Sequence, residues 1–197
     1  MRELHHRLPG FETDIPIREE NYQPFSFTHW KVCLRALTRK HHPMWEVFIL
    51  VAIYWGAWHS YKKLMNTKKV ISHCDLTPRN ILWKDSLPII IDWDAAGYIS
   101  QGKDLIQTMI AWCEEDGRII PERAAHFAEG YGVNSSFINH DYSCEYRSVF
   151  MEDIEWIQML IDRGSDLDNI YCAINKCCLR WRMKENNICI INEAFSR

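Results

Sequence analysis

The sequence predicts an α+β fold that is mostly α-helical, with a small β insert near the middle of the chain. Three observations support this prediction. Helical patterns occupy residues 28–66, short runs of β-branched residues lie between Val70 and Ile91, and apolar residues return to helical spacing after Asp92. Because the 197 residues contain no internal repeat, low-complexity stretch or Gly/Ser-rich linker, we expect a single domain.

The segment before the β insert is predicted to be mainly helical. Residues 1–8 are typical of a helix end, and residues 9–25 form a loop interrupted by prolines and a glycine. A helix is expected over Thr28–Arg39. A longer helix, with Pro43 at its first position and an apolar middle, is expected to end near Met65.

The β insert is expected to begin at Lys69. Its β-type runs are Val70-Ile71, Ile81–Trp83 and Ile89–Ile91. The Asp85-Ser86 turn is expected to join the last two runs as a hairpin.

Helices are expected again beyond this insert. Residues 97–103 are predicted to form a loop that leads into a helix over Asp104–Glu115, where Asp104 favours the positive end of the helix dipole. A last helix over Asp166–Met183 is expected to be capped by Ser165. The other signals are an apolar stripe (Leu105, Met109, Trp112, Cys113), a helix opened by Pro121 and stopped in the Gly130–Gly132 segment, and a second apolar stripe (Phe150, Ile154, Ile157, Ile161).

Composition and charge exclude some classes of function. The chain has 23 basic and 26 acidic residues, a net charge of −3, which argues against a general nucleic-acid binder. The charge is uneven, because residues 1–72 hold 11 basic and 6 acidic residues, whereas residues 73–197 hold 12 and 20. A ligand of the second part is therefore expected to be cationic. The nine tryptophans are interpreted as core residues because no basic residues are interleaved with them.

Cysteine spacing and apolar segments give an expectation about location. The eight cysteines show no zinc-ligand spacing and are interpreted as ordinary buried thiols. The first ten residues lack the apolar segment of a signal peptide, so a reducing cytoplasm is expected. The longest apolar run, Val47–Trp58, has twelve residues where a membrane span needs roughly twenty, so we expect no membrane association.

The stretch Val70–Asp94 contains the residues that indicate chemistry. His73 and Asp75 follow a strand, Asn80 follows Asp75 by five residues, and Asp92 ends the predicted hairpin. Phosphoryl transfer from a nucleotide needs a carboxylate that accepts the proton of the acceptor hydroxyl and two oxygen ligands that hold magnesium. Asp75, Asn80 and Asp92 have these types in this order. His73 is expected to organise the loop through hydrogen bonds.

At these positions the sequence resembles the protein-kinase-like superfamily, and within it the aminoglycoside phosphotransferase and choline kinase branch. The branch's H-x-D-x-x-P-x-N motif is present as residues 73–80, and its I-D-W motif as residues 91–93. The resemblance implies that Asp75 is the catalytic base, with His73 shaping its loop. It also implies that Asn80 and Asp92 hold Mg²⁺ and, through it, ATP. The acceptor is then a small molecule with a hydroxyl group, for example an aminoglycoside or an amino alcohol.

The resemblance covers the C-terminal lobe of such enzymes. Only 72 residues precede His73, and they contain neither a glycine-rich loop nor a Val-Ala-x-Lys strand, so we expect the N-terminal β lobe to be absent. The expected organisation is a helical lead-in (1–66), the catalytic and metal loops (69–94) and a helical acceptor-side subdomain (103–197). A separate chain that supplies the missing lobe, or self-association, is a further expectation.

Two interpretations of function remain open at this stage. The first is an ATP-dependent small-molecule O-phosphotransferase, and the second is a non-catalytic remnant or binding module that keeps an acidic cleft for cationic small molecules. Carboxylates on the later helices either line an acceptor site or form solvated faces. They are Glu114, Glu115, Asp116, Glu152, Asp153, Glu155, Asp162, Asp166 and Asp168. Asp94 is open to the same two interpretations.

Overall fold

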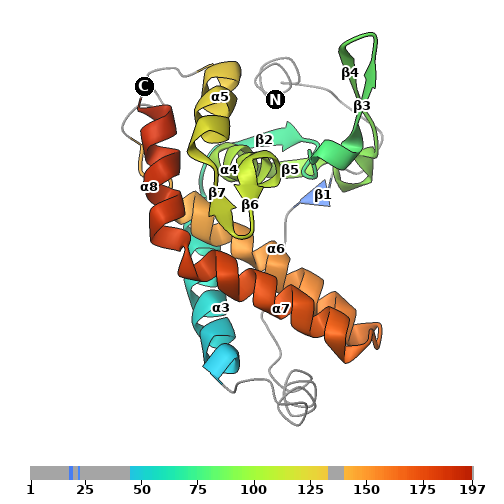
Figure 1. The fold of residues 1–197 in the computed structure, drawn as a ribbon, viewed down its shortest axis with the longest axis vertical. Helices are drawn as coiled ribbons and strands as arrows, with labels where there is room; N and C mark the ends of the chain where they lie inside the picture. The colour runs from blue at the N-terminus through green and yellow to red at the C-terminus, as the bar shows by residue number, and fades with distance from the viewer. Residues whose placement is uncertain (1–17, 20–21, 23–44, 133–139, 197) are drawn as a thin grey trace.

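A computed structural model describes residues 18–19, 22, 45–132 and 140–196, which are mostly helical with small sheets, as predicted (Figure 1). The predicted helices over 1–8 and 28–39 lie outside the described residues. The described helices are α3 (Trp45–Leu64), α4 (Gln101–Cys113), α5 (Pro121–Tyr131), α6 (Ser143–Asp162), α7 (Leu167–Arg182) and α8 (Lys184–Phe195). The described strands are β1 (Arg18–Glu19), β2 (Lys69–Ser72), β3 (Ile81–Lys84), β4 (Leu87–Ile90), β5 (Gly97–Ser100), β6 (Glu114–Glu115) and β7 (Arg118–Ile119).

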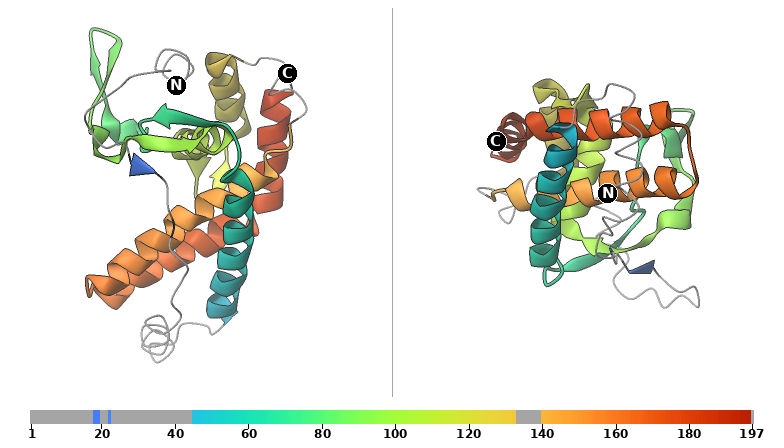
Figure 2. Two further views of the ribbon diagram at one scale, coloured as in Figure 1. Left: turned by 180° about the vertical axis from the view of Figure 1, so that it is seen from behind. Right: turned by 90° about the horizontal axis from the view of Figure 1, so that it is seen from below.

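The long helix predicted before the β insert is confirmed as α3. Its buried face contains Leu50, Ile53, Ala57 and Tyr61, at spacings of three and four, and it packs mainly against α6. Figure 2 shows α6 and α7 side by side, with α3 crossing them. None of the helices in the described part of the chain combines the length and hydropathy that a membrane-spanning segment needs.

The central sheet has the order β1-β5-β2 and differs from the prediction in two places. Strand β1 lies within the segment expected to be a loop, and β5 replaces the first half of the loop expected over residues 97–103. Strand β5 pairs antiparallel with β2, so that Gly97 lies opposite Ser72. Helix α4 begins directly after β5, three residues earlier than predicted. The sequence did not predict β5 because its four residues are too few to show the alternation of a strand, and its pairing with β2 is a tertiary contact.

The predicted hairpin is confirmed as β3 and β4, with Asp85 and Ser86 at its turn. Both turn residues have positive φ (49° and 66°), as a two-residue type I′ turn requires. The hairpin extends away from the helices (Figure 1), and none of its eight strand residues is buried.

Replacing Ser86 by Gly should stabilise the protein. Left-handed backbone costs a residue with a side chain about 1–2 kcal/mol, and the greater freedom of glycine in the unfolded chain offsets roughly half of that gain. Urea denaturation is expected to show an increase of about 0.5–1 kcal/mol in the free energy of unfolding. Ser165→Gly, at a position without positive φ, is the control and should give no increase. An equal gain in both variants would contradict this explanation.

The C-terminal helices follow the predicted apolar spacing but not all of the predicted boundaries. Phe150, Ile154 and Ile157 are buried on α6, whereas Ile161 is half-buried. The cap of α7 is Asp166, not Ser165, because its Oδ1 accepts hydrogen bonds from the backbone N–H groups of residues 168 and 169. Helix α7 ends at Arg182, and α8 follows where no further helix was predicted.

A buried ion-pair cluster joins helix α7 to strand β6 and helix α6. The Arg180 guanidinium of α7 donates Nε and Nη2 to the Glu114 carboxylate at 2.5 and 2.9 Å, and Nη1 to Asp153 at 2.7 Å. The Arg180 side chain is only 9% exposed. Glu114 lies in β6 and Asp153 in α6, so this cluster connects the end of α4 to the α6–α7 pair.

Candidate functional site

His73 lies where β2 ends and is 1% exposed. Its Nε2–H donates to the carbonyl oxygen of Ile91 at 2.8 Å, and its Nδ1 accepts from the backbone N–H of Asp75 at 3.3 Å. A carbonyl oxygen can only accept, so these contacts assign the proton to Nε2. The ring also contacts Trp93, with centroids 4.8 Å apart. His73 therefore connects the loop of Asp75 to the segment that carries Asp92.

The structure brings Asp75 and Asn80 into direct contact. Asn80 is buried, and its Nδ2 donates to both the backbone oxygen and the Oδ2 atom of Asp75, at 2.8 and 2.9 Å. Asp75 itself is exposed. Both amide hydrogens of Asn80 are used to hold Asp75, which leaves the Asn80 amide oxygen as the group that can ligate a cation.

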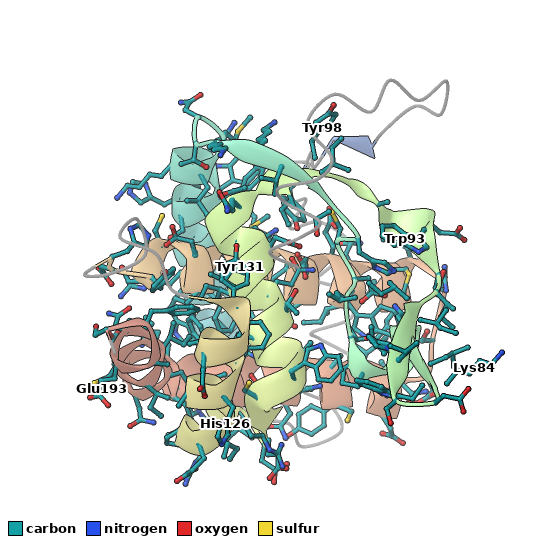
Figure 3. The ribbon with its side chains drawn as sticks, turned by 90° about the horizontal axis from the view of Figure 1, so that it is seen from above. Lys84, Trp93, Tyr98, His126, Tyr131 and Glu193 are labelled. Carbon is teal, nitrogen blue, oxygen red and sulfur yellow. The ribbon has the colours of Figure 1, made fainter. Side chains whose placement is uncertain are left out.

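The base of the hairpin places Asp92 beside this pair. The N–H of Ile91 donates to the backbone oxygen of Asn80 at 3.0 Å, which extends the β3–β4 ladder by one pair. Asp92 is the next residue, is exposed, and has a φ of 61°. Left-handed backbone at a residue with a side chain is uncommon and occurs often at functional sites. Figure 3 shows Trp93, which follows Asp92, and Lys84 of the hairpin on one side of the molecule, away from Glu193.

Helix α4 lies against the same loop and contributes contacts that the sequence did not predict. Asp104, expected at a helix start, is instead buried inside the first turn of α4, and its Oδ2 accepts from the Ser72 hydroxyl at 2.7 Å. Gln107 donates to the backbone oxygen of Cys74, and Trp112 to that of Leu76, both at 2.8 Å. One feature of the sequence indicated the contact of Asp104. This acid immediately precedes the apolar pair Leu105-Ile106, and a carboxylate that is buried among apolar residues needs a hydrogen-bond partner.

A comparison with known proteins identifies the family of the chain. A model of the phosphotransferase enzyme family (APH) matches residues 6–141. The match covers more than half of the chain and includes His73, Asp75, Asn80 and Asp92. The chain belongs to the phosphotransferase enzyme family. A search of curated proteins gave no match.

The oxygen donors at the candidate site of this phosphotransferase-family protein fit a magnesium ion. Asn80 offers an amide oxygen and Asp92 an exposed carboxylate, and Mg²⁺ commonly takes one or two such ligands together with substrate phosphates and water. Among the described residues, no cluster of three or more His, Cys, Asp and Glu side chains could hold a metal. A magnesium ion at this site would therefore complete its coordination with phosphate oxygens and water.

Several of the acids considered for an acceptor site have structural partners. Glu114 and Asp153 pair with Arg180, and Glu152 lies 3.1 Å from Lys103, whose side chain is fully buried. Asp166 caps α7. Glu114, Asp153 and Glu152 therefore have ion-pair partners within the fold. Asp166 is exposed, in agreement with its interpretation as a solvated residue. Asp94, in contrast, is exposed two residues after Asp92.

The interpretation of all tryptophans as core residues is wrong for part of the set. Among the tryptophans whose side chains the structure describes, four are exposed, namely Trp55, Trp83, Trp93 and Trp156. Trp83 lies on the hairpin and Trp93 beside Asp92, so two of the four flank the site. The cysteines also differ from their interpretation, because Cys172 and Cys189 are exposed.

Proposed function

We propose that this protein catalyses the ATP- and Mg²⁺-dependent transfer of the γ-phosphoryl group to a hydroxyl of a small cationic molecule, such as an aminoglycoside or an amino alcohol. The observation that carries the proposal is the exposed Asp75 carboxylate, held by Asn80 and placed next to the hairpin base that presents Asp92. The net negative charge of residues 73–197 favours a cationic acceptor.

Each residue of the site has a role in this reaction. Asp75 orients the acceptor hydroxyl and takes its proton as the oxygen bonds to phosphorus. Asn80 fixes the Asp75 carboxylate through Oδ2, and His73 keeps the two segments together. Asn80 and Asp92 are the residues that would hold Mg²⁺, which neutralises charge on the phosphates when bound.

The exposed hairpin supports a second element of the proposal, a separate nucleotide-binding lobe as partner. Four apolar side chains of this hairpin are 45–69% exposed, namely Leu82, Trp83, Leu87 and Ile89. The first two lie on β3, which begins directly after Asn80, and the other two lie on the paired strand β4. Two-stranded ribbons are marginally stable alone in water. A lobe that covered this ribbon would also enclose the phosphates next to Asp92.

Thermal shift and phosphoryl transfer together test the proposed function. The protein is heated with ATP, with Mg²⁺, with both, and with aminoglycosides or choline alone. Transfer of labelled γ-phosphate to each acceptor is then measured. Stabilisation by ATP that requires Mg²⁺, followed by labelled acceptor, supports the enzyme. Stabilisation by cationic molecules that is independent of nucleotide, with no labelled product, would replace this proposal with the binding module.

A further inference from the structure

We infer that Gln107 and Trp112 are positioning residues for the loop that carries Asp75. The inference rests on the proposed function, and it concerns two residues of α4 that do not contact Asp75 themselves. Gln107 Nε2 donates to the backbone oxygen of Cys74, and Trp112 Nε1 to the backbone oxygen of Leu76, each at 2.8 Å. Cys74 and Leu76 are the two neighbours of Asp75 in the chain, so the backbone carbonyl groups of both neighbours accept hydrogen bonds from side chains of one helix.

Helix α4 holds this segment at three successive points. The Ser72 hydroxyl binds Asp104 before the loop begins, and the bonds from Gln107 and Trp112 follow in the same direction along the helix. With about 1.5 Å of rise per residue, the helix segment from Asp104 to Trp112 is about 12 Å long. The loop therefore runs along a rigid helix, which restricts movement of Asp75 more than one contact could.

Backbone conformation shows why the loop needs external support. Cys74 has a φ of 61°, a left-handed conformation that is unfavourable for a residue with a side chain. Such a conformation persists only when surrounding contacts determine it. The hydrogen bond from Gln107 ends on the carbonyl oxygen of this same residue.

The amide of Gln107 points to positioning rather than to stability. Its Oε1 atom is buried without a hydrogen-bond partner among the residues that the structure describes. A buried carbonyl oxygen without a partner is unfavourable, so a leucine of similar size would avoid this cost. Only the Nε2–H donor of the amide contacts the loop, at the Cys74 carbonyl oxygen. Replacement by leucine removes this cost but also removes the Gln107 donor from the Cys74 carbonyl oxygen. The two effects oppose each other, so we expect global stability to change little while the loop becomes more mobile.

The test compares Gln107→Leu and Trp112→Phe with two matched controls. Gln107→Leu nearly keeps the side-chain volume, Trp112→Phe keeps a smaller aromatic ring, and both variants remove the hydrogen-bond donor. Gln158→Leu removes an amide that binds Asp162 within α6, and Trp58→Phe shortens a partly buried indole of α3.

The first readout does not depend on enzymatic activity. It is the NMR signals of the Asn80 side-chain amide, which donates hydrogen bonds to two atoms of Asp75. These signals are assigned by their loss in Asn80→Ala. The second readout is kcat and KM for ATP. All spectra are recorded below each variant's own unfolding midpoint.

We expect the Asn80 amide signals to shift in both positioning variants and in neither control. The kcat value should fall about tenfold or more, because small displacements of a reacting group have such effects, while KM for ATP changes less than twofold. If the wild-type protein transfers no phosphate but the Asn80 signals still shift, the proposed function fails and the positioning inference stands. Unshifted Asn80 signals, or an unchanged kcat in an active protein, would overturn the inference. If one variant does not fold, the other decides.

Discussion

Asp75→Asn is expected to reduce kcat for phosphoryl transfer by about 10²–10⁴-fold, the usual contribution of a general base. The amide keeps the size and the hydrogen-bonding shape of the carboxylate but cannot take the hydroxyl proton. Because Asp75 is exposed and pairs with Asn80 only through Oδ2 and the backbone, the variant should fold. Initial rates at saturating ATP and acceptor measure the effect.

Asp85→Asn is the matched control for this prediction. Asp85 is an exposed acid at the hairpin turn, and asparagine accepts the same positive φ of 49°. Its kcat should stay within about twofold of the wild type. Equal rates for Asp75→Asn and the wild-type protein would contradict the assignment of Asp75 as the base, whereas equal losses in both variants would show that the assay responds to charge alone.

Arg180→Met is expected to lower the free energy of unfolding by about 3–5 kcal/mol, the usual cost of removing one partner from a buried ion pair. Methionine fills much of the space of the arginine stem, so the loss comes mainly from Glu114 and Asp153, whose carboxylates remain without their counter-ion. Guanidinium denaturation followed by circular dichroism measures the change. Arg182→Met, at an exposed position of the same helix, is the control and should lose less than about 0.5 kcal/mol.

The same cluster gives a pH dependence with a defined sign. Burial raises the pKa of Asp153 above its ordinary value of 3.8, against the opposing effect of Arg180. The folded state then binds more protons than the unfolded state just above pH 3.8, so stability decreases as the pH rises through that window. Without Arg180 the pKa of this carboxyl rises further. The stability difference between Arg180→Met and wild type should therefore be smaller near pH 4 than near pH 7, and a difference independent of pH would contradict this explanation.

The elements that the sequence predicted correctly are those that depend on residues within one short segment. The α3 helix, the α6 stripe and the β3–β4 hairpin all follow from spacing or turn chemistry within one segment. Strand β5 could not be predicted in this way, since its existence depends on pairing with β2 almost thirty residues earlier. The α7 cap was misplaced by one residue, because Ser165 and Asp166 are both good caps and only the backbone direction selects between them.

The candidate site shows the same division. The order and spacing of His73, Asp75, Asn80 and Asp92 are properties of the sequence alone. They predicted the family, which the family model that matches residues 6–141 confirms. The tertiary structure decided which neighbours hold the loop of Asp75. Three side chains of α4, Asp104, Gln107 and Trp112, bind β2 and the loop only because this helix packs along them. Glu114 and Asp153 are removed from the candidates for an acceptor site because Arg180 of α7 lies between them. A sequence pattern specifies chemistry within a segment, whereas the partner of a buried polar group depends on which distant element packs against it.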